Sequence, residues 1–377
     1  MFILTRYLLR QFVQIFAICF LSLTGLYIVI DAFGHLDHFS SHAKEHGSLI
    51  AIVAEYYAYR SLDFFDRTSG ILAMIAAMFT VTWLQRHHEM TAMLAAGISK
   101  FRILRPLIVS VGVVSLCAAA NREWVIPQVR DQLTRDSKDL GGVSARSLEA
   151  RFDSQTDILI GGEKVVVAEQ RILRPTFILE GDLAKYGRRL VAESAVYAPA
   201  EGTRPSGYFL RNVSTPKHIA EKASLYLEEK PIIVTPRDAS WLKEDELFVA
   251  SELSFTMLAN GSTWRNYSST TELIAELSHP STDLGPDVQV AVHSRAVQPL
   301  LDGTLLMLGL PLMFSRRNRN VFLSIGICLV VATLFFLATI ACRSLGDLGM
   351  VRPALAAWAP LLVFIPVAAA MSQTLRT

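Results

Sequence analysis

The chain has 377 residues and a formal net charge of only +2, whereas 51% of its residues are hydrophobic. Its mean hydropathy is +0.35. These values are unusual for a soluble protein, and the apolar residues are concentrated in long blocks. The composition therefore argues against a soluble enzyme and against a strongly basic nucleic-acid-binding protein, and it indicates a membrane protein.

Six apolar segments lie three before and three after one polar block. Crossing a hydrocarbon core about 30 Å thick takes about 20 helical residues, which most of these segments provide. The fourth is the weakest, because it is short and carries Asp302, which is costly if it faces lipid; we expect it near the outer interface. The predicted spans are 12–30, 68–85, 106–121, 296–315, 320–342 and 353–375.

The beginning of the chain predicts a retained first helix. Arg6 and Arg10 precede an apolar run that is too long for the core of a cleaved signal peptide, and no small-residue cleavage site follows. All four cysteines fall in or at the end of apolar runs, so the polar block has no disulfide framework.

The charge distribution predicts the topology. The segments on the side of the N-terminus hold ten basic residues against one acid, Glu89, whereas the opposite loop, 31–67, is mainly acidic. Basic residues in short loops mark the cytoplasmic side of a membrane protein. We therefore predict that both termini are cytoplasmic and that the polar block 122–295 lies outside. The ten basic residues are Arg6, Arg10, Arg86, Lys100, Arg102, Arg105, Arg316, Arg317, Arg319 and Arg376.

The polar block predicts an all-β domain. Residues 157–160 and 164–168 are expected to form a hairpin that turns at Gly161 and Gly162, and further short apolar runs follow with frequent Pro and Gly. Many short strands indicate an antiparallel sandwich or open barrel. Helix is expected at 122–140, continuing the third span, and at 271–277. The predicted domains are 1–140, 141–280 and 281–377.

The cytoplasmic loop that follows the second span predicts a short amphipathic helix at 87–99. Its apolar residues follow helical spacing, and methionines give that face an adaptable surface. Such a helix suits the groove of a cytoplasmic partner, but the pattern also fits an interfacial helix that lies flat on lipid, which is a common kind of helix. The residues of this expected face are Met90, Met93, Leu94, Gly97, Ile98 and Phe101.

Three enzyme motifs are absent from the sequence: GxxxxGK[ST], GxSxG and HExxH. The chain is therefore expected to have no ATPase site of its own, no catalytic residues and no bound cofactor. If it is an active transporter, another polypeptide must hydrolyse ATP.

Two polar clusters are candidate ligand sites. His35, His38, His42 and His46 could bind zinc, contact an anion in a pH-sensitive way, or be an ordinary solvated segment. Basic residues just outside the third span could meet lipid phosphates, or belong to a mixed-charge surface, because acids are interleaved with them. These basic residues are Arg122, Arg130, Arg135 and Lys138.

Several motifs resemble the permease family of lipopolysaccharide export, the LptF/LptG type. The segment from Glu89 to Ser99, Glu-Met-Thr-Ala-Met-Leu-Ala-Ala-Gly-Ile-Ser, is similar to the coupling-helix motif of that family, and the three-plus-three layout matches as well. Leu23-Thr-Gly-Leu resembles the LptG branch, although Ile28 stands where that branch has a lysine. The other similar stretches are Glu123-Trp-Val-Ile-Pro-Gln128, Arg295 with Pro299 and Leu310-Pro311, and Leu355-Ala-Ala-Trp-Ala-Pro360.

The resemblance implies a fold and a function. It implies a six-span helical bundle of the inner membrane with a periplasmic β-jellyroll domain. It further implies pairing with a sister permease or a second copy, a cytoplasmic ATPase dimer, and transfer of lipopolysaccharide to a periplasmic jellyroll bridge. Residues 89–99 would transmit closure of the ATPase, with Glu89 as the polar contact and Met90, Met93 and Ile98 as the apolar contacts.

Two other functions remain open from the sequence. The chain could be a membrane-anchored β domain that recruits envelope partners without transport. It could also be an intramembrane metalloenzyme built on the histidine stretch.

Overall fold

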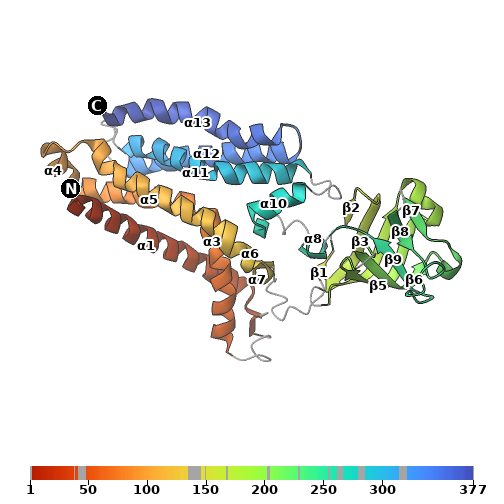
Figure 1. Ribbon diagram of the computed structural model, residues 1–377. Coiled ribbons are helices and arrows are strands. Elements are labelled where there is room, and N and C mark those ends of the chain that lie inside the picture. Colours follow the sequence, from red (N-terminus) through yellow and green to blue (C-terminus); the bar gives the residue numbers. More distant parts are fainter. Residues whose placement is uncertain are drawn as a thin grey trace. The chain divides into compact units, whose positions relative to one another are not determined.

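The computed structural model forms two compact units, each with its own hydrophobic core (Figure 1). The helical unit comprises Met1–Gln132 and Gly285–Thr377, and the β unit comprises Leu133–Leu284. The residues that the structure describes are 2–37, 39–40, 48–134, 146–148, 150–166, 169–201, 204–227, 230–253, 255–260, 266–278, 285–313 and 321–376.

Within the described ranges, six helices of the helical unit are long and apolar enough to cross a membrane. They confirm the six predicted spans. The second of them has 38 residues, which gives it a length of about 57 Å, so its ends project beyond a hydrocarbon core of about 30 Å. The predicted loop 31–67 was therefore too long, because this helix already begins at Leu49. The six are α1 (Phe2–Gly34), α3 (Leu49–Arg86), α5 (Lys100–Ala120), α11 (Pro286–Met313), α12 (Val321–Asp347) and α13 (Pro353–Arg376).

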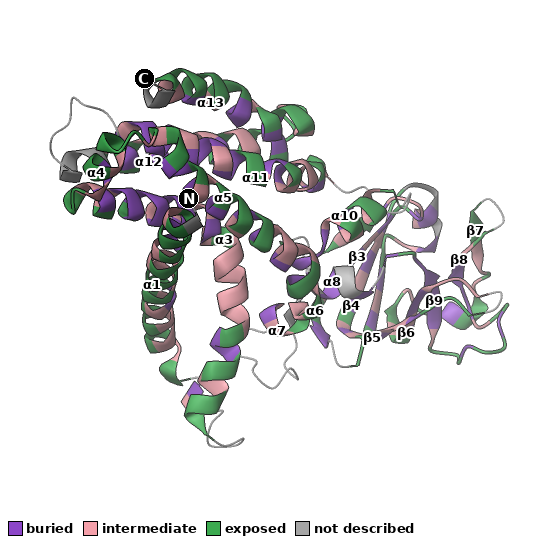
Figure 2. Ribbon diagram, turned by 60° about the vertical axis from the view of Figure 1, so that its left-hand side comes forward, coloured by how far each residue is buried: buried purple, intermediate pink, exposed green. Residues whose placement is uncertain are grey.

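Helix α11 lies at the centre of the helical unit. It packs against α3 and α5 from the first half of the chain and against α12 and α13 from the second. Its apolar residues occur all around the helix, which is typical of a buried helix, and 61% of its most apolar window is buried. For α1 the corresponding share is 6%, and Figure 2 shows most of that helix as exposed. Helix α1 thus leaves a large apolar surface uncovered by this chain.

The third span continues beyond α5 as predicted. The chain passes through a π-helical turn at Asn121–Val125 into α6 (Ile126–Gln128) and α7 (Arg130–Thr134). The Asn121 amide donates to the carbonyl oxygen of Leu62 at 3.0 Å, which ties this turn to α3. Residues 135–140 of the predicted continuation lie outside the described residues.

The β unit contains one antiparallel sheet and confirms the inserted all-β domain. The sheet order is β1-β3-β4-β5-β6-β9-β8-β7, with β2 also paired to β3. Burial alternates along β4, as expected for a strand with one face on a core. The strands are β1 (Arg146–Ser147), β2 (Arg151–Asp153), β3 (Ile158–Val166), β4 (Arg171–Leu179), β5 (Arg189–Ala198), β6 (Gly207–Thr215), β7 (Leu225–Leu227), β8 (Lys230–Val234) and β9 (Leu247–Ala250).

The predicted hairpin at Gly161 and Gly162 was wrong. Both glycines lie inside β3, where they pair with Thr176 and Pro175 of β4. A side chain at Gly162 would lie 2.6 Å from Ile172 Cγ2. This glycine pair therefore serves the close approach of the two strands, rather than a turn.

Short helices complete the β unit. The predicted helix at 271–277 is confirmed as α10 (Thr270–Leu277), whose first turn is capped by Ser269: its hydroxyl accepts from the Glu272 N–H, and the Glu272 side chain accepts from the Ser269 N–H. The remaining short helices are two 3₁₀ turns, Gly181–Tyr186 and Ile219–Glu221, and α8 (Phe255–Asn260).

Candidate functional site: a coupling helix and a buried polar network

The predicted coupling segment contains a shorter helix, α4 (Glu89–Ala95). The chain turns away after Ala96, because Gly97 adopts a φ of +78°, which favours glycine. The N–H groups of Gly97 and Ile98 donate to the carbonyl oxygens of Leu94 and Met93, at 3.0 and 3.1 Å, and so satisfy the end of the helix. Ser99 then occupies the N-cap position of α5 with an extended backbone, and its carbonyl oxygen accepts from the N–H groups of Arg102 and Ile103.

The coupling segment has an anchored side and an open side. Met90 is only 5% exposed and belongs to the core of the helical unit, and Met93 and Ile98 pack against that core. Leu94 is 37% exposed, and Thr91, Ala92 and Ala95 lie on the same open side. Met90 therefore holds α4 to the bundle, whereas Leu94 is available to a partner.

A polar contact ties α4 to the first span. The Tyr7 hydroxyl on α1 lies 3.1 and 3.0 Å from the two carboxylate oxygens of Glu89 and donates its hydrogen to them. The carboxylate predicted to contact an ATPase thus also connects two helices of this chain.

The predicted headgroup residues have different surroundings. Arg122 forms an ion pair with Asp66 of α3, with 3.0 Å between Nη2 and Oδ1, and only 17% and 13% of the two side chains are exposed. His35 Nδ1 lies 2.9 Å from the carbonyl oxygen of Asp31, and Arg130 begins α7. Arg135, Lys138 and His38 lie outside the described residues.

The zinc hypothesis gains no support from the described part of the chain. Within it, no group of three or more His, Cys, Asp or Glu side chains is arranged to hold a metal ion. His42 and His46 lie outside the described residues, as does His38.

A polar network that the sequence analysis did not predict joins three spans. The Asp302 carboxylate of α11 accepts hydrogen bonds from the Ser115 hydroxyl of α5 at 2.7 Å and from the Gln298 amide at 3.1 Å. Arg343 of α12 donates in turn to the carbonyl oxygen of the Gln298 side chain at 2.8 Å. The acid inside an apolar run was the sequence signal for this network, and Gln298 lies only four residues away on the same helix. The contact with Ser115, 187 positions away, and the contact of Gln298 with Arg343 depend on helix packing that the sequence does not reveal.

Opposite this network, α3 approaches α11 closely at Gly70. A Cβ built on Gly70 would overlap the Asp302 carboxylate. The structure therefore buries Asp302 between α3 and α5, so that its carboxylate does not face lipid, and its position near the outer interface stays a prediction.

Among the described residues, six helices long and apolar enough to cross a membrane, a helix on the connection between the second and third of them, and an inserted β domain define the architecture of a multi-pass membrane protein. A comparison with family models matches residues 6–374 to the lipopolysaccharide export system permease LptF/LptG family. The chain belongs to this family and is a permease subunit of a lipopolysaccharide export system. Among curated proteins, the comparison found no match.

Proposed function

We propose that this chain extracts lipopolysaccharide from the outer leaflet of the inner membrane, driven by ATP hydrolysis on a separate cytoplasmic ATPase dimer. The basic loops support cytoplasmic termini and an outward, periplasmic β unit. The chain itself supplies no Walker motif, so the energy has to arrive through a contact with another polypeptide.

This proposal rests on the observation that one side of the coupling segment is buried in the bundle core while the other side is exposed. A helix that only lay on lipid would not need both a core methionine and a hydrogen bond to the first span. Movement imposed on the open side, at Leu94, passes through Met90 into the bundle core and through Glu89 to Tyr7 on α1. The segment can therefore convert closure of a motor into displacement of the spans.

Helix α1 offers a surface for the other half of the transporter. It is long, apolar and mostly uncovered by its own chain, with Ile18, Leu21 and Ile30 each more than half exposed. A sister permease, or a second copy, would cover part of this surface, and acyl chains would occupy the space between the two.

The β unit is suited to passing the lipid on to another protein. Its sheet runs from β1 to β7 without closing among the described strands, so the edges at its two ends can pair with a strand of another protein. We propose that a periplasmic jellyroll bridge protein adds to such an edge and receives the lipid.

Co-purification with the ATPase tests the coupling role. Leu94→Asp places a charge on the open side of α4 and is expected to reduce the recovered ATPase about tenfold or more, because a desolvated charge opposes an apolar contact. Leu348→Asp is the matched control, because Leu348 is 74% exposed and lies just after α12. Met93→Asp and Glu89→Ala, which also alter contacts within the bundle, are expected to act in the same direction.

The alternative is a β-domain scaffold without transport. It predicts that Leu94→Asp leaves both ATPase recovery and lipid-stimulated hydrolysis at the level of the Leu348→Asp control. That result would remove the coupling role while leaving the family assignment intact.

A further inference from the structure

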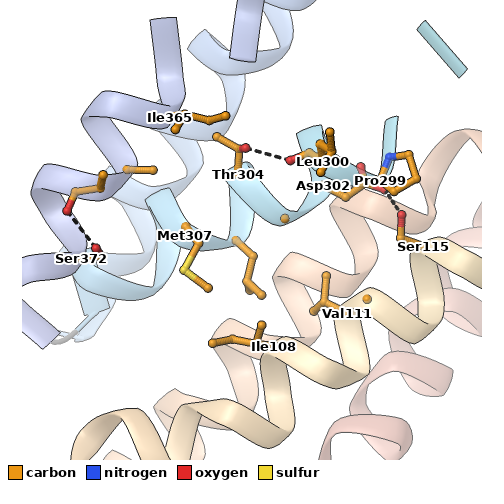
Figure 3. Close-up of a pocket in the computed structure, with 15 residues that line it drawn as sticks. Ile108, Val111, Ser115, Pro299, Leu300, Asp302, Thr304, Met307, Ile365 and Ser372 are labelled. Carbon is orange, nitrogen blue, oxygen red and sulfur yellow. Dashed lines mark hydrogen bonds between the residues drawn. The ribbon is translucent and has the colours of Figure 1, made fainter. Parts of the chain in front are cut away.

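A cavity of about 460 Å³ lies within the helical unit, between α5, α11 and α13. Figure 3 shows Ile108 and Val111 of α5, Met307 of α11 and Ile365 of α13 around it. Two glycines on facing helices leave this space open, because nothing lies within 4 Å of a Cβ built on Gly112 or Gly303. Its volume falls in the range of about 300–1,000 Å³ that small-molecule sites occupy.

The lining is apolar with one exception. The hydroxyl groups of Thr304 and Ser372 donate to carbonyl oxygens of their own helices, at 2.7 and 2.8 Å, and are thereby satisfied (Figure 3). Asp302 is the one ionisable side chain among the described residues that line the cavity, and it is only 7% exposed.

The hydrogen bonds of Asp302 come from neutral groups, and the arginines Arg122 and Arg343 attract its carboxylate only from a distance. The two hydrogen-bond donors to its carboxylate, Ser115 and Gln298, are neutral, and Arg343 reaches only the far side of the Gln298 amide. Within the described ranges, no Lys or Arg nitrogen lies within 4.0 Å of the carboxylate. Each carboxylate oxygen has two lone pairs, so acceptor capacity remains. A buried anion of this kind is costly unless a positive group joins it.

The shape of the cavity and the charge of Asp302 together indicate the class of ligand. An alkyl chain fits the apolar lining, and a positively charged donor at its end fits the carboxylate. A phosphate-bearing headgroup does not, because it would bring like charge to Asp302. We propose that this cavity binds a single-chain alkylammonium amphiphile that enters from the membrane, with its ammonium group donating to Asp302. This site is separate from the proposed path of lipopolysaccharide, whose phosphates Asp302 would repel.

Photo-cross-linking of the full-length protein in nanodiscs of zwitterionic lipid tests the proposal. The probe is dodecylamine with a mid-chain diazirine, and the matched probe is the corresponding carboxylic acid. At neutral pH the amine is expected to label peptides of α5, α11 and α13 saturably. Unlabelled dodecylamine should compete, whereas butylamine, which remains in water, should not. Competition by butylamine would instead indicate a water-borne amine and overturn the membrane origin.

Three variants distinguish the contribution of the Asp302 charge from that of the cavity volume. Asp302→Asn keeps the size of the side chain and is expected to reduce amine labelling about tenfold, the effect of losing one ion pair. Gly303→Leu fills the cavity while Asp302 stays, and is expected to abolish labelling. Asp287→Asn, on the same helix but outside the cavity, should label like the wild type. Equal labelling by the acid probe, or unchanged labelling in Asp302→Asn and Gly303→Leu, would overturn the proposal. If Asp302→Asn fails to fold, Gly303→Leu and the probe comparison still decide it.

Discussion

The Tyr7 hydroxyl on α1 and the Glu89 carboxylate on α4 are joined by a hydrogen bond of 3.0–3.1 Å that spans 82 positions of the chain. It connects the helix most exposed to lipid and partners with the segment proposed to contact the ATPase. A shift of α4 thus acts on α1 directly, and not only through the bundle core.

Tyr7→Phe is expected to weaken this connection without changing the shape of the side chain. One hydrogen bond to a carboxylate at a partly exposed site corresponds to about a two- to tenfold loss of lipid-stimulated ATPase activity. The measurement is hydrolysis by the assembled complex in nanodiscs. Tyr226→Phe, in the β unit and 57% exposed, is the control. Equal activity of the two variants would show that the bond transmits nothing.

Gly70→Ala is expected to destabilise the helical unit by about 1–3 kcal/mol, because the new methyl group would overlap the Asp302 carboxylate. Gly25→Ala in α1 is the matched control. Nothing lies within 4 Å of its Cβ position, so the higher helix propensity of alanine should leave stability unchanged or raised. Thermal unfolding in nanodiscs compares the two, and equal midpoints would contradict the packing described for Asp302.

The Arg122–Asp66 pair is expected to contribute about 1–3 kcal/mol in a double-mutant cycle with Arg122→Gln and Asp66→Asn, since both side chains are mostly buried. The exposed Arg67–Asp63 pair, where 59% of the arginine side chain is exposed, should contribute only about 0.3–0.5 kcal/mol. Titration with SDS measures both cycles. A coupling energy near zero for the first pair would mean that Arg122 is free to hold a phosphate group.

Asp238 gives the β unit a pH-dependent contact. The Ser224 N–H donates to its Oδ2 at 2.6 Å and holds the pKa of this carboxyl below its ordinary value. Because the folded pKa is the lower one, the contact stabilises the β unit above the unfolded pKa of about 3.9 and is lost as pH falls through the folded value.

Asp238→Asn should therefore speed hydrogen exchange around Ser224 at neutral pH, relative to wild type. The difference should vanish once the pH has fallen below the lowered pKa of Asp238 in the folded protein, because the wild-type carboxyl is then protonated as well. Exchange rates are compared after correction for intrinsic rates, with Asp245→Asn as control. A difference that persisted unchanged in acid would assign the effect to shape rather than charge.

The sequence predicted the six spans and the β domain because both depend on local apolar patterns. It did not predict contacts between distant segments. Asp66 pairs with Arg122, which lies 56 positions away in the chain. The arginine could not be distinguished from a lipid-binding one, because the approach of α3 to the outer end of α5 is a tertiary property.

Local sequence patterns also gave two wrong predictions, one for a turn and one for the extent of a helix. The Gly161–Gly162 pair looks like a turn, but its function is to admit a neighbouring strand, which only the sheet register reveals. The predicted coupling helix was expected to run through 99, but it ends at Ala95, before Gly97, and its Met90 is buried in the core of its own bundle. An amphipathic pattern identifies the apolar face of a helix without showing whether that face meets its own chain or another.

The core of the helical unit is completed by helices made at different times. Gln85 of α3 donates to the carbonyl oxygen of Met313 of α11 at 3.1 Å, and Gly70 of α3 faces Asp302. All of Leu133–Leu284 is synthesised between these helices. During biogenesis the first three spans are therefore synthesised before their central packing partner exists, and the whole β domain is made in between. A chain truncated after Gln132 is expected to insert into the membrane, fail to assemble and be cleared by membrane proteases.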